Sequence, residues 1–269
     1  LCDVPAVAIL TREGPDAVRG LIEIGAQFDS RDGQLIVGRE AAHGRSRIIH
    51  AHGDATGAEV QRAASEAVAA APNIRILRNT MLTDLVLLQG KCVGIEALDR
   101  VSGERVRVLA GATLLATGGS GNLYRVTTNP PVATGDGFAV AWRAGAALQD
   151  MEFVQFHPTA LADASYPRFL ISAAVRGEGA ILRNAADEAF MGRYSPTQLD
   201  LAPRDEVSRA VLSEMKRDAA DHVCLDLSPI GEVGSVERRF PGITGELRER
   251  GIWDGDGMRI PVTPAAHYM

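Results

Sequence analysis

Cysteine is scarce in this chain. Only Cys2, Cys92 and Cys224 occur among 269 residues, and their spacing fits neither a disulfide framework nor a zinc-binding motif. We therefore expect a reducing, cytoplasmic setting. The six histidines lack HxH and HExxH spacing, so no metal site is predicted either.

Long apolar runs and blocks of like charge are also lacking. No run approaches the roughly 20 apolar residues that a membrane-spanning helix needs, so we expect no membrane span. The net charge of −6 includes no acidic tail and no basic arm, which argues against a nucleic-acid partner. The opening "LCDVPAVAIL" has neither an initiator Met nor a signal-peptide pattern, and we expect it to lie inside a longer gene product.

What is present is an ordinary globular composition, with 46% hydrophobic and 23% charged residues. Helical periodicity predicts amphipathic helices over 13–29 and 54–72. A further helix is predicted over 203–219, where Val207 and Val211 lie on the apolar face.

Runs with β-strand character follow the second predicted helix. The segments 73–79, 82–89, 92–98 and 104–110 are separated by turn signals and predict a small antiparallel meander. The meander leads into an apolar strand predicted over 111–119. A tight turn and a short helix are predicted next, in "TGDGFAVAWRAGA".

Glycines end the predicted strand in "LLATGGSGN". Gly118 and Gly119 allow the backbone to approach a ligand closely and offer N–H groups to a phosphate or a flavin edge, although a plain turn is the simpler explanation. Asp136 in "TGDG" is either an N-terminal cap of the next helix or a carboxylate that accepts hydrogen bonds from ligand hydroxyls.

Three further motifs contain polar residues that could bind a ligand. His157 in "QFHPTAL" is either a buried structural histidine or a ligand-binding one. Arg204 in "APRD" opens a helix against its dipole, so it needs a carboxylate partner from the protein or from a ligand. Arg176 and Glu178 in "RGEG" fit a structural ion-pair network or a binding site, and His267 in "PAAHYM" indicates little by itself.

The order of the motifs is more informative than any one of them. "HAHGDATG", "LLATGG", "TGDGFAVAWRAG", "EFVQFHPTAL", "RGEGAIL", "APRDEVSRA" and "PAAHYM" occur in the order found in the succinate dehydrogenase/fumarate reductase flavoprotein family, which the chain resembles over nearly its whole length. The resemblance implies a mixed α/β (α+β) fold. Residues 1–150 would form a partial Rossmann-like FAD-binding domain with the antiparallel meander, 151–265 an α+β capping domain that binds substrate, and 266–269 a return into the first domain.

Within this family the chain most resembles the branch that oxidises L-aspartate, through "TAL" after "QFHP", "PAAHY" and "GREAAHGRSRIIHAHGDATG". The last stretch would place Glu40 beside the substrate's amino group, because an ammonium needs an anionic partner. The implied reaction is hydride transfer from the substrate's C2 carbon to the flavin N5 nitrogen, which gives iminoaspartate for quinolinate and NAD biosynthesis. The alternatives are a fumarate reductase or succinate dehydrogenase flavoprotein subunit, and a flavin-free, catalytically silent fragment.

The resemblance also implies roles for individual residues. Arg204 would clamp a carboxylate and stabilise charge rather than transfer a proton, since a guanidinium is hard to deprotonate, and Arg176 would lie beside it. The implied substrate-binding residues are Glu40, Gln155, His157, Ser172 and His267. The implied contacts to a non-covalent FAD are Thr117, Gly118, Gly119 and Asp136.

The implied partners are L-aspartate or another C4 dicarboxylate, oxygen or fumarate as electron acceptor, and quinolinate synthase. The chain departs from the family at Ala173, where a glutamate of the proton route is usual, and this weakens the fumarate reductase alternative. Ala41 and Ala42 replace a commoner Gly-Gly pair. The GxGxxG turn that holds the FAD pyrophosphate is missing, so we expect weak or no FAD binding by these 269 residues alone.

Overall fold

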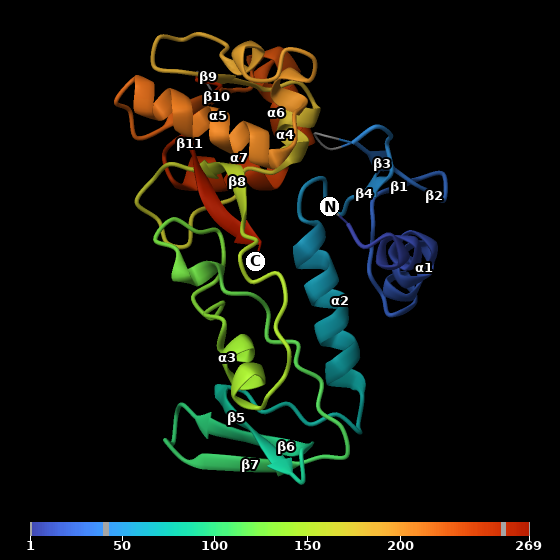
Figure 1. Ribbon diagram of the computed structural model, residues 1–269. Coiled ribbons are helices and arrows are strands. Elements are labelled where there is room, and N and C mark those ends of the chain that lie inside the picture. The colour runs from blue at the N-terminus through green and yellow to red at the C-terminus, as the bar shows by residue number, and fades with distance from the viewer. Residues whose placement is uncertain (1, 40–42, 254–256, 269) are drawn as a thin grey trace. The chain divides into compact units, whose positions relative to one another are not determined.

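The computed structural model describes residues 2–39, 43–253 and 257–268. The chain divides into two compact units, each built from three stretches of sequence. Figure 1 labels their helices and strands. The first unit comprises Leu1–Arg75, Ser172–Ala180 and Leu227–Met258. The second unit comprises Ile76–Ile171, Ile181–Asp226 and Arg259–Met269.

The first unit is mainly helical. Its α-helices are α1 (Val4–Glu23), α2 (Thr56–Ala70), α4 (Ala173–Gly177), α6 (Val233–Arg239) and α7 (Pro241–Glu249). Two short antiparallel ladders pair β1 (Ser30–Arg31) with β2 (Gln34–Leu35) and β3 (Val37–Gly38) with β4 (Ile48–Ile49). None of the helices in the described ranges is long and apolar enough to cross a membrane.

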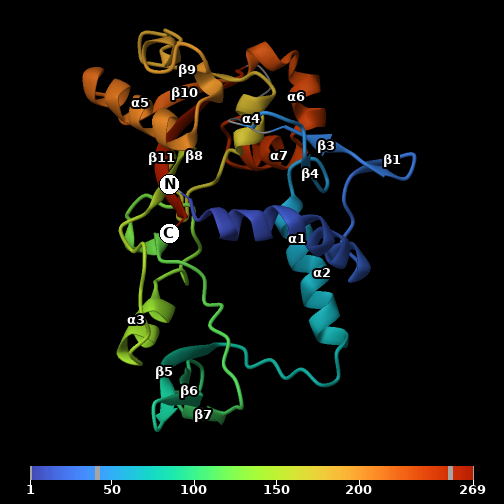
Figure 2. The same ribbon diagram turned by 45° about the vertical axis from the view of Figure 1, so that its right-hand side comes forward.

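The helix α1 begins earlier than the sequence pattern predicts. The Asp3 carboxylate accepts a hydrogen bond from Ala6 N at 3.1 Å, and a proline stands in the first turn, where its missing N–H costs little. The helix therefore spans Val4–Glu23 rather than 13–29. Figure 2 shows α1 crossing α2, which forms over Thr56–Ala70 as predicted.

Acidic side chains hold the segments of the first unit together. Glu59 of α2 accepts hydrogen bonds from Gln27 N at 2.6 Å and from Arg62 Nε at 2.8 Å. The hydrogen bond from Arg62, followed by that from Gln27, lowers the Glu59 pKa to about 2. Asp54 accepts a hydrogen bond from Gly242 N at 3.1 Å, at the start of α7, where a negative charge is favourable. The acidic residue of "HAHGDATG" therefore has a structural role.

The second unit contains two antiparallel sheets. The meander, in the order β5-β6-β7, consists of β5 (Thr80–Leu88), β6 (Lys91–Asp99) and β7 (Arg105–Leu109). The four-stranded sheet, in the order β8-β11-β10-β9, consists of β8 (Gln155–Leu161), β9 (Ile181–Arg183), β10 (Val223–Asp226) and β11 (Arg259–Tyr268). The α-helices of this unit are α3 (Asp136–Arg143) and α5 (Arg204–Arg217).

The helix α5 packs beside the four-stranded sheet (Figure 1). Its face of Val207, Ala210 and Val211 is buried, as the sequence periodicity predicts. Ser208 Oγ donates a hydrogen bond to the Phe156 carbonyl oxygen at 3.1 Å, which ties the helix to β8. Because Pro203 is the N-cap residue, the helix begins at the next residue, beside the β8 strand.

Two strands predicted from the sequence are absent from the described residues. The segments 73–79 and 111–119 form no strand, so these two predictions are wrong. An apolar strand needs hydrogen-bonded neighbours, and none of the described strands pairs with 111–119, where Leu114 is 90% exposed. At a coarser level, the prediction of a mixed α/β fold with an antiparallel meander is confirmed.

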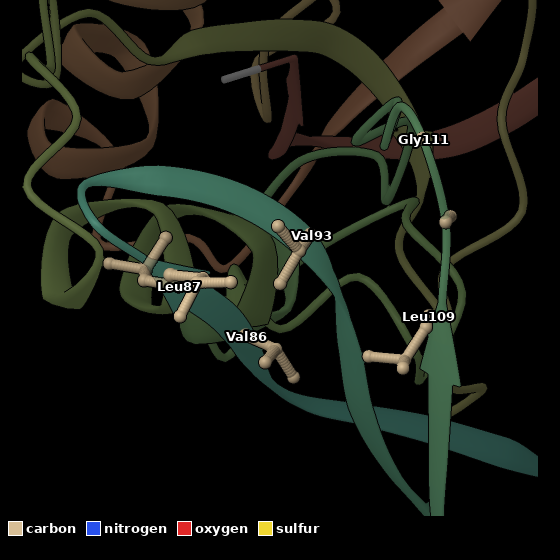
Figure 3. A pocket seen from close by; sticks show the side chains of 7 residues that line it. Val86, Leu87, Val93, Leu109 and Gly111 are labelled. Atoms are coloured by element: carbon tan, nitrogen blue, oxygen red, sulfur yellow. The ribbon is translucent and has the colours of Figure 1, made fainter.

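An apolar hollow of about 520 Å³ lies at one end of the meander (Figure 3). Its walls are aliphatic side chains and a glycine: Val86, Leu87, Leu88, Val93, Leu109, Ala110 and Gly111. None of these side chains can donate or accept a hydrogen bond, so the hollow has no side-chain means of orienting a polar ligand. We therefore do not assign a polar substrate to this hollow.

A buried carboxylate organises the C-terminal half of α5. Glu214 is fully buried and accepts hydrogen bonds from Asn184 Nδ2 at 3.0 Å, Arg193 Nη2 at 2.8 Å and Tyr194 Oη at 2.7 Å. Arg217 also pairs with it. Each donor compensates part of the cost of removing the charge from water.

We predict that Glu214→Ala destabilises the protein by about 2 kcal/mol, because the Asn184 amide and the Tyr194 hydroxyl lose a buried acceptor. Thermal unfolding of the full-length protein measures the effect. Glu249→Ala, which removes an exposed glutamate of α7, serves as the control and is expected to leave the melting temperature nearly unchanged. Equal melting temperatures for both variants would contradict the structural role of Glu214.

Candidate functional site

The pairing of β8 with β11 brings two predicted site residues together. His157 lies opposite Ala265, and Gln155 lies opposite Tyr268. The register is irregular between Thr263 and Ala265 and again between Ala266 and Tyr268. The rings of His157 and His267 therefore meet edge to face, with their centroids 5.2 Å apart. Two motifs far apart in the sequence form one site.

His157 is fully buried. Thr159 N donates a hydrogen bond to His157 Nδ1 at 3.3 Å, and Thr159 Oγ1 donates to the Ile171 carbonyl oxygen at 2.9 Å. Because Nδ1 is an acceptor, a neutral ring carries its proton on Nε2. His157 is therefore held in the tautomer that can donate a hydrogen bond from Nε2.

His267 contacts Thr128 and Asn129, two residues that the sequence patterns did not select. Thr128 Oγ1 lies 2.7 Å from His267 Nδ1, and Asn129 Nδ2 donates a hydrogen bond to the His267 carbonyl oxygen at 2.7 Å. Burial, and secondly the positive charge of Arg204, lower the His267 pKa to about 4. The ring is therefore neutral at pH 7.

Arg204 is the first residue of α5, and its side chain contacts β8. Its Nη1 donates a hydrogen bond to Gln155 Oε1 at 2.9 Å. Arg204 thus contacts an amide oxygen, while the neighbouring Asp205 carboxylate pairs with Arg209 at 2.8 Å. We call Gln155, His157, Arg204 and His267 the His-Arg cluster; it offers one cation and neutral donors to an anionic ligand.

The predicted residues Arg176 and Ser172 belong to the first unit, whereas the His-Arg cluster belongs to the second. Arg176 is fully buried in α4. Ser172 is the N-cap residue of α4, where its Oγ accepts a hydrogen bond from Ala174 N at 3.2 Å. Glu178 pairs with Arg239 at 2.9 Å, so "RGEG" takes part in a structural ion pair. Glu40 lies outside the described residues.

The glycine-rich motifs meet at the start of α3. Gly118 and Gly135 both have positive φ, of 73° and 78°, and Gly135 N donates a hydrogen bond to the Gly119 carbonyl oxygen at 3.2 Å. A Cβ on Gly137 would lie 1.8 Å from Thr117 Oγ1, so the two motifs pack without room for a side chain. The predicted glycine turn therefore exists and is tightly built.

A cavity of about 790 Å³ adjoins this turn. Thr117 and Asp136, two of the predicted cofactor contacts, line it, together with Asn79 and Arg100. Gly135 is the N-cap residue of α3, while the Asp136 carboxylate accepts a hydrogen bond from Thr134 Oγ1 at 2.9 Å. The walls of the cavity combine a carboxylate, a guanidinium and hydroxyls. These groups suit the sugar and phosphate parts of a nucleotide. Among the described residues no group of three metal-binding side chains occurs.

Comparison with known proteins gives a consistent result. The FAD binding domain family matches residues 1–269. Over its full length the chain is 46% identical to an L-aspartate oxidase of Nostoc sp. and 48% identical to one of Streptomyces coelicolor, covering 46% and 47% of those proteins. It is 44% identical to the chloroplastic L-aspartate oxidase of Arabidopsis thaliana and covers 43% of it. The chain thus spans about half the length of these curated relatives.

Solved structures agree. The whole chain matches 48% of a mutant FrdA chain of E. coli quinol fumarate reductase, with a TM-score of 0.89 and 31% identity. It also matches Sdh1 of Mycobacterium smegmatis over 96% of its own length and 45% of that chain, with a TM-score of 0.74 and 34% identity.

The family model covers the whole chain, so the chain has the fold of an FAD-binding protein. It belongs to the FAD binding domain family and is homologous to L-aspartate oxidases. The resemblance inferred from the order of the sequence motifs is therefore confirmed.

We predict that Arg204→Gln raises the His267 pKa above about 4, because the positive charge of Arg204 is one of the two causes that lower it. A pH titration of the ¹⁵N-labelled histidine side chains measures this pKa, and His267→Gln identifies the signal. Arg209→Gln, on the same helix, is the control. An unchanged or lower His267 pKa in Arg204→Gln would contradict the electrostatic coupling.

Proposed function

We propose that this chain supplies FAD-binding and substrate-binding parts of an enzyme that oxidises L-aspartate to iminoaspartate, which serves quinolinate and NAD biosynthesis. The observation that carries the proposal is the His-Arg cluster, whose donors suit a carboxylate. Identities of 42–48% to curated L-aspartate oxidases, measured over the whole of this chain, support aspartate as the substrate.

In this proposal the His-Arg cluster binds the carboxylates of the substrate. His157 and His267 donate hydrogen bonds from Nε2, and Arg204 adds a charge-assisted hydrogen bond. Gln155 orients Arg204 through its amide oxygen, 2.9 Å from Nη1. Arg204 stabilises negative charge on the substrate rather than acting as a base, because a guanidinium stays protonated in proteins.

Three further residues are proposed to contact the substrate. Arg176 would add a second guanidinium, Ser172 a hydroxyl, and Glu40 a carboxylate for the ammonium group of aspartate. A carboxylate is the natural partner of an ammonium, and succinate has no group that needs one. Glu40 is therefore the proposed basis of selectivity for the amino acid.

Thr117, Gly118, Gly119 and Asp136 are proposed to contact non-covalent FAD. The cavity of about 790 Å³ beside the glycine turn supports this, since Asp136 can accept hydrogen bonds from sugar hydroxyls and Arg100 can face a phosphate. When bound, FAD would supply the oxidising chemistry by taking a hydride from the substrate's C2 carbon at its N5 nitrogen. The protein's part is to orient the substrate toward it.

The wider assignments belong to the same proposal. We assign residues 1–150 to a partial Rossmann-like FAD-binding domain, 151–265 to the capping domain and 266–269 to the return. Oxygen or fumarate would accept the electrons, and quinolinate synthase would use the product. A cytoplasmic location is expected from the three widely spaced cysteines, although some relatives are named as chloroplastic.

A second candidate is a fumarate reductase or succinate dehydrogenase flavoprotein subunit. The TM-score of 0.89 to a fumarate reductase chain favours it, whereas identity is lower there, at 31%, than to the L-aspartate oxidases. Ala173 also lacks the carboxylate that the resemblance associates with proton transfer in fumarate reductases.

Steady-state oxidation by the full-length, flavin-loaded protein separates the two candidates. We expect turnover with L-aspartate and little with succinate, because the proposed site contains a carboxylate for the ammonium group. Turnover of succinate alone would reject the aspartate assignment and favour the second candidate.

Within the same assay, we predict that Arg204→Lys lowers kcat/KM for L-aspartate by about 10-fold to 100-fold, since lysine lacks the planar fork. Ser172→Ala should cost only a few-fold in kcat/KM, and its loss of a helix cap should appear as a lower melting temperature. Comparable losses of kcat/KM in both variants would argue against a carboxylate clamp at Arg204.

A further inference from the structure

The segment "TTN", residues 127–129, holds the end of β11 in the second unit. Thr127 forms a parallel bridge with Ala266, and its Oγ1 donates a hydrogen bond to the Ala266 carbonyl oxygen at 3.1 Å. Thr128 N donates to the same carbonyl at 3.1 Å. Asn129 Nδ2 donates to the His267 carbonyl oxygen at 2.7 Å. The backbone on both sides of the His267 ring is therefore fixed by this segment.

The Thr128 side chain contacts the ring itself. Its Oγ1 lies 2.7 Å from His267 Nδ1 and 3.4 Å from the Ala266 carbonyl oxygen. A hydroxyl has one proton to donate, and a neutral imidazole has one N–H. Two arrangements follow: Thr128 donates to Nδ1 and the ring proton is on Nε2, or Nδ1–H donates to Thr128 and Nε2 is bare.

The first arrangement is favoured by geometry. The 2.7 Å contact is a hydrogen bond in both arrangements, which differ in where the hydroxyl proton goes. In the second arrangement its only other acceptor is the Ala266 carbonyl oxygen at 3.4 Å, whose two lone pairs already accept from Thr127 Oγ1 and Thr128 N at 3.1 Å. The first also presents Nε2–H to the site, while the second presents a lone pair. A carboxylate only accepts hydrogen bonds when ionised, so it binds the first arrangement and is repelled by the second.

The two histidines differ in the group that faces their Nδ1 nitrogen. Nδ1 of His157 accepts a hydrogen bond from a backbone N–H, that of Thr159, at 3.3 Å, and a backbone N–H can only donate. The tautomer of His157 is therefore fixed by the chain itself. Nδ1 of His267 faces a hydroxyl, which can either donate or accept.

We propose that Thr128 is a positioning residue that holds His267 in the tautomer with its proton on Nε2, so that the ring donates a hydrogen bond to a substrate carboxylate. This inference rests on the proposed function, in which His267 binds the substrate. Thr128 itself does not touch the substrate and acts through His267.

The test compares Thr128→Val, which keeps the shape and removes the hydroxyl, with Thr128→Ser, which keeps the hydroxyl. Thr263→Val is the matched control, because Thr263 lies on the same strand as His267 and its Oγ1 meets Met215 Sδ at 4.0 Å. Histidine side-chain ¹⁵N shifts of the full-length protein report the tautomer, with His267→Gln identifying the signal. Calorimetric titration with succinate reports carboxylate binding.

We expect the Nε2–H tautomer in the wild-type protein, Thr128→Ser and Thr263→Val, and a mixture of tautomers in Thr128→Val. The succinate dissociation constant should rise about tenfold in Thr128→Val, the value of one hydrogen bond to a charged group, and return to within about threefold of wild type in Thr128→Ser. Melting temperatures confirm that each variant is folded.

An unchanged tautomer in folded Thr128→Val would overturn the inference, even if succinate binding weakened, because the effect would then come from packing alone. A changed tautomer with unchanged succinate affinity would also overturn it. If the wild-type protein neither binds succinate nor oxidises L-aspartate, the proposed function fails separately, and the tautomer of Thr128→Val still decides whether the hydroxyl sets the state of the ring.

Discussion

The antiparallel pairing of β8 (Gln155–Leu161) with β11 (Arg259–Tyr268) is the interaction on which the His-Arg cluster depends. Side chains alternate between the two faces of a strand, so a shift of one residue would move a histidine to the opposite face. The irregular register near Ala265 and Ala266 adjusts this alternation and leaves the rings of His157 and His267 in edge contact. The register of these two strands therefore determines whether the two histidines can meet.

The helix α5 adds charge to this pair. Its buried apolar face fixes the helix against the sheet, and its first residue, Arg204, lies beside Gln155. The guanidinium also helps to lower the His267 pKa to about 4, so the ring is a neutral donor at pH 7 rather than a second cation. One charge and two neutral donors suit the proposed carboxylate ligand, because they avoid the mutual repulsion that three cations would create.

Local patterns in the sequence predicted the elements that depend on local physics. The helices α2, α3 and α5 and the meander carry their own periodicity and turn residues, and they form where expected. The segment 111–119 does not form a strand, because pairing is a long-range property that its apolar composition cannot supply. Resemblance to a family selected His157, His267 and Arg204. Nothing local pointed to Thr128, which meets His267 across 139 positions of sequence.

These residues are proposed to serve a flavin-dependent oxidation of L-aspartate. The most direct measurement is the visible spectrum of the purified full-length protein, recorded without oxygen before and after addition of L-aspartate. We predict a flavin absorption band that bleaches on addition, because hydride transfer reduces FAD. A flavin band that persists in the presence of L-aspartate would contradict the assignment of aspartate as the substrate, and a protein without a flavin band would contradict the assignment of FAD.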